Sequence, residues 1–461
     1  MKYPSQNVPT ACLIDGEHYL PNLRESLHML EKKFNIRYLI FIGGTEKIGT
    51  INEVKNTFSY PVFFASKKAN PEDKPDILKL HSILKKHPVK LVLDLSDEPI
   101  MDYETRLRAA SFVLHLGIDY AGSDFYFEAP QFKKILTKPS LAIWGTGKRI
   151  GKTAIGGFVG RLLKRHKLEP AIVTLSRGGP NHPLLVRGDK IKIDLDYLLS
   201  IDKKGLHASS DCFEDALTAR VPTFGCRRCG GGMAGRTMVT VLDQGVRKAE
   251  QSKFVKSVVI EGSGATVPEI KTEKIILVMD ATQPLSTLEG YFTTFRILCA
   301  DLIIINMCED FLVTKSKIAN LIQYIRNIKP KVKIATTVLR PSLIGTQTLT
   351  GKNIFLATTA DPKVLPFLKK IIEKKYGCRV KSMTHHLAVR PTLKKEIAKA
   401  LPHVDFAVTE VKAAAIAVVA REAFNIGLPT IFMDNILQVV SKGGNIKNIE
   451  QEILSLVKRK K

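Results

Sequence analysis

Short apolar runs alternate along the chain with stretches in which apolar residues recur at helical spacing. Before residue 135 the runs ACLIDG, YLIFIGG, PVFFAS and VKLVLDLS predict strands, and NLRESLHMLEKKF and DILKLHSILKKH predict helices between them. Strands that alternate with helices are typical of a parallel sheet covered on both faces. The pattern therefore predicts an α/β fold with a Rossmann-like α/β domain at the N-terminus.

A longer series of strands begins after Lys138-Pro139, a dipeptide that indicates a linker. Its runs are LAIWG, PAIVTLS, SVVIEG, KIILVMD, ADLIIIN, KIATTVL and NIFLATT. DFAVTEV, KAAAIAVVAREAF and PTIFMD then predict a small C-terminal α/β region. We expect an N-terminal α/β domain at residues 1–137, a core at 138–373 and the C-terminal region at 374–461.

Polar residues and glycines follow several N-terminal strands. They are Asp15, Glu17, His18, Gly43, Gly44, Asp94 and Asp97. Ligands of parallel sheets bind at the carboxyl ends of strands, which makes these residues candidates for a site. Asp and Gly are also common turn residues, and this second interpretation stays open.

The run LAIWGTGKRIGKTA leads from an apolar strand through a glycine-rich loop into a helix. Such a loop binds phosphates through its backbone N–H groups, so we expect Lys152 to reach the β- and γ-phosphates of ATP and Thr153 to ligate Mg²⁺. Thr146 stands where the consensus G-x-x-x-x-G-K-[ST] has its first glycine. The expected nucleotide-binding residues are Gly145, Thr146, Gly147, Lys148, Arg149, Gly151, Lys152, Thr153 and Ala154. The core is therefore predicted to be a P-loop NTPase with a mainly parallel sheet.

The loop, with its spacing G-T-x-x-x-[VI]-G-K-T, resembles that of dethiobiotin synthetase and its relatives, a branch of the P-loop NTPases. VVIEGSGATVP resembles a second segment of that branch, in which a glutamate binds Mg²⁺. The resemblance implies that Glu261 and Thr153 form the metal site, and oxygen ligands suit a hard cation. It also implies that Asn306, at the end of LIIIN, contacts the nucleotide base. A simple turn residue is the alternative for Asn306.

Residues 220–236, RVPTFGCRRCGGGMAGR, contain four arginines and no acidic residue. Arginine binds phosphate and carboxylate bidentately, and glycine lets the backbone approach a ligand closely. We expect an anion-binding loop; a redox element or metal site at Cys226 and Cys229 and a structural segment are the alternatives. The expected substrate-binding residues are Arg177, His182, Arg187, Arg227, Arg228, Gly230, Gly231 and Arg236.

The net charge of +26, from 70 Lys and Arg against 44 Asp and Glu, has three interpretations. They are nucleic-acid binding, a highly anionic small substrate, and a solvated lysine-rich surface. Stacking aromatics are scarce among the clustered cations, which favours a small anionic substrate over nucleic acid. We also expect a cytoplasmic protein without a membrane partner, because the sequence has neither a membrane-spanning run nor a signal core.

The segments DGEH, CRRCGGGMAG, THHLAVRP and TEVKAAA extend the resemblance to the whole chain, which resembles the archaeal cyclic 2,3-diphosphoglycerate synthetases. The resemblance implies an ATP-dependent ligase that joins the two phosphates of 2,3-diphosphoglycerate, releases ADP and phosphate, and makes a compatible solute of thermophilic methanogens. So anionic a substrate needs charge compensation, which makes Lys148, Lys152, Arg227 and Arg228 the expected catalytic residues. We expect a homodimer. A related P-loop ligase or kinase and a metallochaperone-type NTPase remain alternatives.

Overall fold

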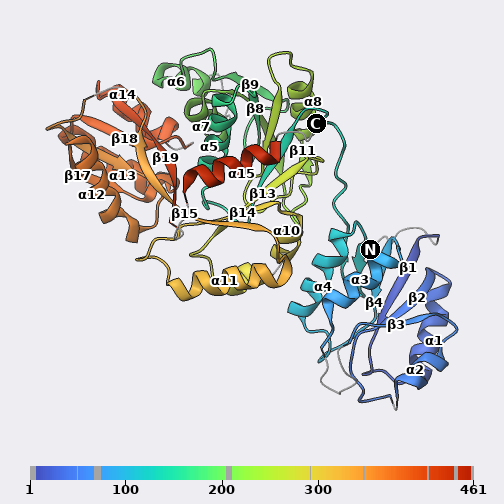
Figure 1. The fold of residues 1–461 in the computed structure, drawn as a ribbon. Helices are drawn as coiled ribbons and strands as arrows, with labels where there is room; N and C mark the ends of the chain where they lie inside the picture. The colour runs from blue at the N-terminus through green and yellow to red at the C-terminus, as the bar shows by residue number, and fades with distance from the viewer. Residues whose placement is uncertain are drawn as a thin grey trace. The chain divides into compact units, whose positions relative to one another are not determined.

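The structure, a computed structural model, describes residues 7–48, 50–66, 74–203, 210–290, 292–345, 348–412, 415–440 and 445–457. The chain divides into two compact units, whose elements are labelled in Figure 1. The first unit comprises residues 1–131, 284–299 and 327–330, and the second comprises the rest. Within the described ranges, no helix is long and apolar enough to cross a membrane.

The first unit is built on a sheet of strand order β3-β2-β1-β4-β5-β6, parallel except for β6. Its strands are β1 (Pro9–Ile14), β2 (Asn35–Phe41), β3 (Val62–Phe64), β4 (Leu91–Asp94), β5 (Asp119–Ala121) and β6 (Tyr126–Phe127). Its helices are α1 (Leu20–Glu31), α2 (Ile51–Thr57), α3 (Ile77–Lys86), α4 (Tyr103–His115), α9 (Leu285–Glu289) and α10 (Thr293–Cys299). In Figure 1, α1 and α2 lie on one side of the sheet and α3 and α4 on the other. Cover on both faces explains why these strands are apolar throughout.

The second unit is built on a long sheet of order β11-β10-β8-β12-β7-β13-β14-β15-β19-β18-β16-β17, with β9 beside β10. Its strands are β7 (Ser140–Gly145), β8 (Pro170–Ser176), β9 (Leu184–Arg187), β10 (Pro222–Cys229), β11 (Val239–Thr240), β12 (Ser257–Glu261), β13 (Lys274–Asp280), β14 (Leu302–Asn306), β15 (Lys333–Leu343), β16 (Asn353–Ala357), β17 (Arg379–Thr384), β18 (Phe406–Glu410) and β19 (Thr430–Val439). Its helices are α5 (Lys152–Arg165), α6 (Leu195–Lys203), α7 (Ser210–Ala219), α8 (Leu242–Gln251), α11 (Lys315–Ile328), α12 (Leu365–Tyr376), α13 (Arg390–Ala400), α14 (Arg421–Asn425) and α15 (Ile446–Val457). A π-helix (Ala415–Ala420) and 3₁₀ turns at Pro362–Val364, His386–Ala388 and Leu401–His403 complete the elements.

The centre of this sheet confirms the predicted α/β fold. Strands β8, β12, β7, β13 and β14 are parallel neighbours, as expected of a P-loop core. Apolar residues of α5, including Ile155, Val159 and Leu162, pack with those of β7 and β12 in one buried cluster. This packing fixes the start of α5 at the carboxyl end of β7.

Strand β15 joins the core to the C-terminal part of the sheet. Its first half pairs with β14 in parallel, and its second half pairs with β19 antiparallel. The predicted boundary at residues 373/374 is wrong, because it cuts α12, and β16, which precedes that helix, pairs with β17 and β18, which follow it. The C-terminal region therefore begins earlier in the chain. The predicted boundary at 137/138 stays a prediction.

The predicted loop at residues 220–236 is partly a strand. β10 covers Pro222–Cys229 and lies parallel to β8; it is buried from Pro222 to Cys226, and burial alternates only at its end, where Arg228 is buried between exposed Arg227 and Cys229. This strand was not predicted, because two arginines and a glycine interrupt its apolar pattern. Arg227 and Arg228 therefore lie on a hydrogen-bonded strand and not on a free loop.

Candidate active site

The phosphate loop lies between β7 and α5 and is shaped by glycines. Gly151 precedes α5 with φ +90°, a conformation that favours glycine, and no side chain caps the helix. The N–H groups of the first helical turn are therefore available to an anion. A Cβ on Gly145 would lie 2.6 Å from Ile150 Cδ1 and 2.7 Å from Lys152 Cδ, so the strand end also needs glycine.

Lys152 is folded into the loop and is only 7% exposed. Its Nζ donates a hydrogen bond of 2.6 Å to the carbonyl oxygen of Gly147. Burial lowers the pKa of Lys152 to about 8, against the opposing effects of the Glu261 and Asp211 carboxyl groups. An incoming phosphate can replace the carbonyl as the partner of this ammonium group. Thr146, where the consensus glycine is missing, donates a 2.6 Å hydrogen bond to Gln283 Oε1.

Buried oxygens from three elements meet beside the start of α5. The Thr153 hydroxyl donates to Glu261 Oε1 at 2.9 Å, and Glu261 interacts with Asp215 of α7. A Cβ on Gly156 would lie 3.1 Å from Glu261 Oε2 and 3.5 Å from Asp215 Oδ1, so this glycine makes room for both carboxyl groups. Burial, and then the charge of Asp211, raises the pKa of Glu261 to about 7.

These oxygens fit a magnesium ion. Among the described residues, Glu261 Oε2 and both Asp215 carboxyl oxygens are buried with no hydrogen-bonding group in reach other than each other's carboxyl group. No three His, Cys, Asp or Glu side chains converge as a ready-made metal site in the described ranges. Mg²⁺ needs no such group, because one or two carboxylates and the substrate phosphates hold it. Asp211 and Asp215 were not among the residues predicted from the sequence, although their spacing in SSDCFEDA places both carboxyl groups on one face of a helix.

Three cations gather next to the phosphate loop. Arg228 Nη2 donates to the Ser263 carbonyl oxygen at 3.2 Å, and Arg177 Nη2 lies 2.9 Å from the position that a Cβ on Gly264 would take. Burial and the neighbouring Arg177 lower the pKa of Arg228. Burial, Arg149 and then Arg177 lower the pKa of Lys148. Repulsion within this set favours the binding of an anion between these cations.

Three predicted substrate residues, Arg227, Gly230 and Gly231, lie beside this group. Arg227 is exposed on β10, and its Cβ lies 3.8 Å from the position that a Cβ on Gly179 would take. Gly230 follows β10 with φ +73°, and its carbonyl oxygen accepts a 2.9 Å bond from Arg228 Nη1. Gly231 lies within 3.5 Å of the same guanidinium group, measured from its added Cβ. The end of β10 therefore brings the backbone of Gly230 and Gly231 close to the Arg228 side chain.

Other predicted substrate residues have different surroundings. The assignment of Arg187 to this group is wrong. Arg187 pairs with Pro222 at the opposite end of β10, and its side chain donates two hydrogen bonds to Asp189. Arg236 forms an ion pair of 3.0 Å with Glu269. His182 is exposed and lies 3.0 Å from Asn181.

Asn306 holds the phosphate loop. Its side chain is fully buried, its Nδ2 donates to the Ile150 carbonyl oxygen at 3.0 Å, and its Oδ1 accepts from Thr337. Asn306 therefore positions the loop in the described structure. The predicted base contact stays a prediction.

The two cysteines of CRRC are free thiols on opposite faces of β10. Cys226 is buried against Gly245, where an added Cβ would come within 2.2 Å of its Sγ. Cys229 is exposed. Cys226 therefore packs as a small core residue.

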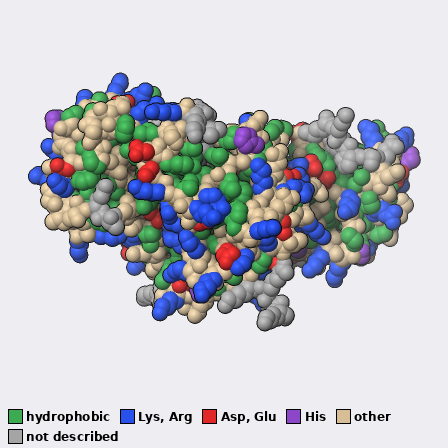
Figure 2. Space-filling view, turned by 90° about the horizontal axis from the view of Figure 1, so that it is seen from above, with side chains coloured by type: hydrophobic (Ala, Val, Ile, Leu, Met, Phe, Trp, Pro, Cys, Tyr) green, Lys and Arg blue, Asp and Glu red, His purple; other side chains and the backbone are tan. Residues whose placement is uncertain are grey.

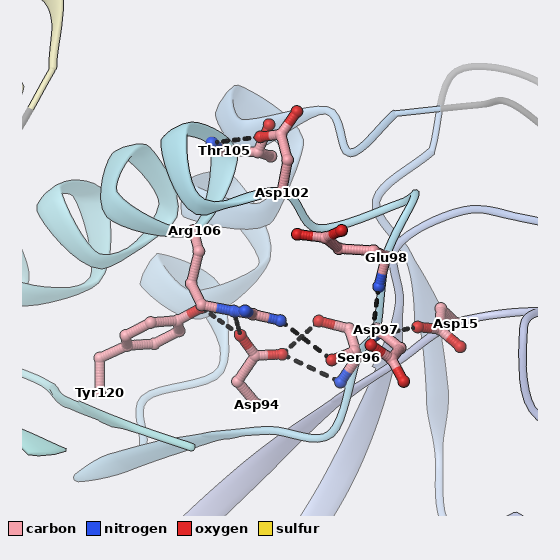
Figure 3. Close-up of polar contacts among 9 residues, drawn as sticks. All are labelled: Asp15, Asp94, Ser96, Asp97, Glu98, Asp102, Thr105, Arg106 and Tyr120. Atoms are coloured by element: carbon pink, nitrogen blue, oxygen red, sulfur yellow. Dashed lines mark hydrogen bonds and ion pairs between the residues drawn. The ribbon is translucent and has the colours of Figure 1, made fainter. Parts of the chain in front are cut away.

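The polar residues at the carboxyl edge of the N-terminal sheet bind mainly one another (Figure 3). Fully buried Asp15 accepts hydrogen bonds from the backbone N–H groups of Asp97 at 2.6 Å and Glu17 at 3.0 Å, and lies 2.8 Å from the His18 ring. Asp94 pairs with the Nε of Arg106 at 2.9 Å. These contacts tie the loops after β1 and β4 together, which fits the turn interpretation.

Lysine and arginine side chains are spread widely over the face of the molecule in Figure 2. They are interrupted there by hydrophobic and other polar side chains. Much of the net charge of +26 is therefore ordinary surface charge. The cations at the phosphate loop form a separate set because Lys152 and Arg228 are buried.

A glycine-shaped phosphate loop between a strand and a helix, opposite a buried glutamate at the end of the neighbouring strand, defines a P-loop NTPase of α/β fold. Family models described as the N-terminal, P-loop and C-terminal domains of cyclic 2,3-diphosphoglycerate synthetase match residues 9–128, 140–338 and 346–436. The chain belongs to the cyclic 2,3-diphosphoglycerate synthetase family, which confirms the resemblance inferred from the sequence.

Relatives with that name are similar over nearly their whole length. The chain is 42% identical to the cyclic 2,3-diphosphoglycerate synthetase of Methanothermus fervidus, covering 96% of each chain. It is 40% identical to that of Methanothermobacter thermautotrophicus over 97% of this chain and 96% of the relative. It is also 40% identical to that of Thermococcus kodakarensis over 97% of this chain and 98% of the relative.

Proposed function

We propose that this protein is an ATP-dependent synthetase that closes 2,3-diphosphoglycerate into its cyclic phosphoanhydride and releases ADP and inorganic phosphate. Family membership along the whole chain supports this function. The single structural observation that carries it is the meeting of Arg177, Arg228 and Lys148 at the phosphate loop. A substrate with two phosphates and a carboxylate supplies the negative charge that compensates the positive charge of these three side chains.

The reaction proceeds in two steps on the substrate's own oxygens. An oxygen of one substrate phosphate attacks the γ-phosphorus of ATP in line, and the bond from that phosphorus to the β-phosphate oxygen of ADP breaks. An oxygen of the neighbouring phosphate then attacks the activated substrate phosphorus. The bond to the added phosphoryl group breaks, and inorganic phosphate leaves. Both attacking oxygens are already ionised, so the protein needs neither a nucleophile nor a general base.

The chain's own residues position and neutralise these groups. Lys152 is placed to exchange the Gly147 carbonyl for an ATP phosphate, and the uncapped start of α5 offers backbone N–H groups beside it. Arg228, fixed by the Ser263 and Gly230 carbonyl oxygens, presents its charge to the substrate. Stabilising the charge that develops during phosphoryl transfer is the main catalytic contribution of such cations.

The proposal includes Mg²⁺, which Thr153 and Glu261 would hold with Asp215 or Asp211 nearby. When bound, the ion neutralises phosphate charge. Its binding requires the carboxyl groups to lose the protons that burial favours. The cytoplasmic location, the homodimer and the thermophilic context stay predictions from the sequence.

Release of ADP and phosphate that depends on 2,3-diphosphoglycerate tests this function. We expect equal amounts of ADP and inorganic phosphate from ATP and Mg²⁺ in its presence, and little with 2-phosphoglycerate or 3-phosphoglycerate, which lack the second phosphate for ring closure. ADP without inorganic phosphate would indicate a kinase. Full activity with either monophosphate would contradict cyclisation.

A further inference from the structure

The C-terminal strands carry a second set of polar side chains at their carboxyl ends. Glu410, the last residue of β18, is nearly buried and accepts hydrogen bonds from the Thr358 hydroxyl at 2.9 Å and from the Thr359 hydroxyl at 2.8 Å. The Thr359 backbone N–H donates to the same carboxylate at 3.1 Å. Ligands of parallel sheets bind at this edge. Neither the phosphate loop nor the arginine cluster uses these residues.

The chain that leaves β18 is anchored on α7. Val411 is fully buried with Phe213 and Ala216 of α7 in one apolar cluster. Lys412 follows, and its ammonium group donates to Glu214 Oε2 at 2.5 Å. Glu214 is a neighbour of Asp215 in α7. Lys412 is therefore brought from a distant part of the sequence to the helix that faces the phosphate loop.

Lys412 shares its surroundings with Lys152. The Asp211 carboxyl group acts on both lysines, and each lysine is close enough to Asp211 for this charge to shift its pKa. Burial lowers the pKa of Lys412, but Glu214, Glu410 and Asp211 outweigh burial and raise it, so the ammonium stays charged. Among the described residues, Glu214 is its one hydrogen-bond acceptor, and 29% of the side chain is exposed. An ammonium group has three donors, so two remain for a ligand.

We propose that Lys412 binds an anionic group of the substrate and is the contribution of the C-terminal region to the active site. This inference rests on the proposed function, because it assigns the residue to the phosphorylated substrate of that reaction. The arginine cluster lies at the loop after β12, whereas Lys412 approaches along α7. A substrate with three anionic groups can use cations from both places.

A purely structural interpretation of Lys412 is that it fastens the C-terminal region to α7 through Glu214. The double variant Lys412→Met with Glu214→Gln separates the two interpretations. It removes both members of the hydrogen-bonded pair, so Glu214 is not left as a charge without its partner, and thermal stability should return towards that of the native protein. Affinity for the substrate should stay low if Lys412 binds it.

Steady-state kinetics and calorimetric titration with 2,3-diphosphoglycerate test the proposal. For Lys412→Met, and equally for the double variant, we expect KM and Kd for this ligand to rise on the order of 10- to 100-fold, as for loss of one charge-assisted contact. KM for ATP should change little, and Lys412→Arg should restore part of the affinity. Lys256→Met is the matched control, because Lys256 pairs with Glu169 in an exposed ion pair and lies outside the site.

Native affinity in the double variant would overturn the proposal and show that Lys412 only holds the C-terminal region on α7. Unchanged KM and Kd in Lys412→Met would overturn it as well. Failure of the native protein to bind or turn over 2,3-diphosphoglycerate would be a different result, because it contradicts the proposed function before any variant is compared.

Discussion

Lys152 is a buried cation whose hydrogen-bond partner is a backbone carbonyl of its own loop. A buried ammonium group is costly unless it is paired. The phosphate oxygens of ATP would give this ammonium group a charged partner in place of the carbonyl. The sequence motif predicted its identity and role, but it could not reveal the internal bond to Gly147, which depends on how the loop folds.

Replacement of Lys152 by alanine should abolish ATP-dependent turnover, by on the order of 100-fold or more, as for loss of one charge-stabilising donor. The fold should remain, because the hydrogen bond of Lys152 stays within its own loop and Lys152 is not part of the apolar cluster that packs α5 on the sheet. Turnover and circular dichroism measure the two effects. Near-native turnover in a folded Lys152→Ala protein would show that the phosphate loop is not the site of ATP chemistry.

Glu261→Gln should raise the Mg²⁺ concentration that gives half-maximal activity, because a neutral amide oxygen replaces a charged ligand of the same shape. The Thr153 hydroxyl, 2.9 Å from Glu261, can still donate to the amide oxygen, so local packing is kept. Titration of activity with Mg²⁺ at fixed ATP makes the comparison. If midpoint and maximum both match the native protein, Glu261 has a structural role alone.

The elements β12, α5 and α7 bury the carboxyl groups of Glu261 and Asp215 next to each other. Burial raises the pKa of Glu261 from 4.5 to about 7, and that of Asp215 well above its ordinary value. The folded protein therefore keeps protons that the unfolded chain releases above about pH 4.5. The stabilisation by Glu261 is complete below that pH and is lost as pH rises through about 7.

We predict that the free energy of unfolding of the ligand-free protein, without Mg²⁺, contains a component that falls between pH 4.5 and 7. The expected slope is about 1.4 kcal/mol for each pH unit per proton retained. Denaturant titrations at several pH values measure it. Glu261→Gln should flatten the slope, and an equal slope in the variant would contradict the assignment.

Strand β10 places one arginine and one cysteine of the same short motif on each of its faces, with Arg228 and Cys226 buried and Arg227 and Cys229 exposed. Arg228→Ala should raise KM for 2,3-diphosphoglycerate or lower turnover by about 10- to 150-fold, with ATP affinity little changed, because a charge-assisted contact is lost. The double variant Cys226→Ser, Cys229→Ser should keep its chemistry and lose only stability, since Cys226 is buried and both thiols are free. A dead cysteine variant beside an active Arg228→Ala protein would reverse these roles.

Local patterns in the sequence predicted most strands, because strands buried on both faces are continuous apolar runs. β10 was missed because Arg227 and Arg228 interrupt its run. The phosphate loop and Glu261 were predicted from motifs. Lys412 lies 198 residues from Glu214, and a contact at such a separation depends on the tertiary fold.

For the whole molecule, the long sheet explains how one site can draw on the P-loop core and the C-terminal region. β15 pairs with β14 on the core side and with β19 on the other, so the two parts share one sheet. Composition and periodicity predicted the α/β class, but they do not specify which strands pair. This is why the boundary at 373/374 was placed too late.

The most direct test of the central claim is phosphorus NMR of a reaction that contains the protein, ATP, Mg²⁺ and 2,3-diphosphoglycerate. The proposed function predicts that the two phosphomonoester signals of the substrate disappear together and that phosphoanhydride signals of a cyclic product replace them. ADP and inorganic phosphate should accumulate in equal amounts. Hydrolysis of ATP with the substrate signals unchanged, or a product that keeps a phosphomonoester signal, would contradict ring closure.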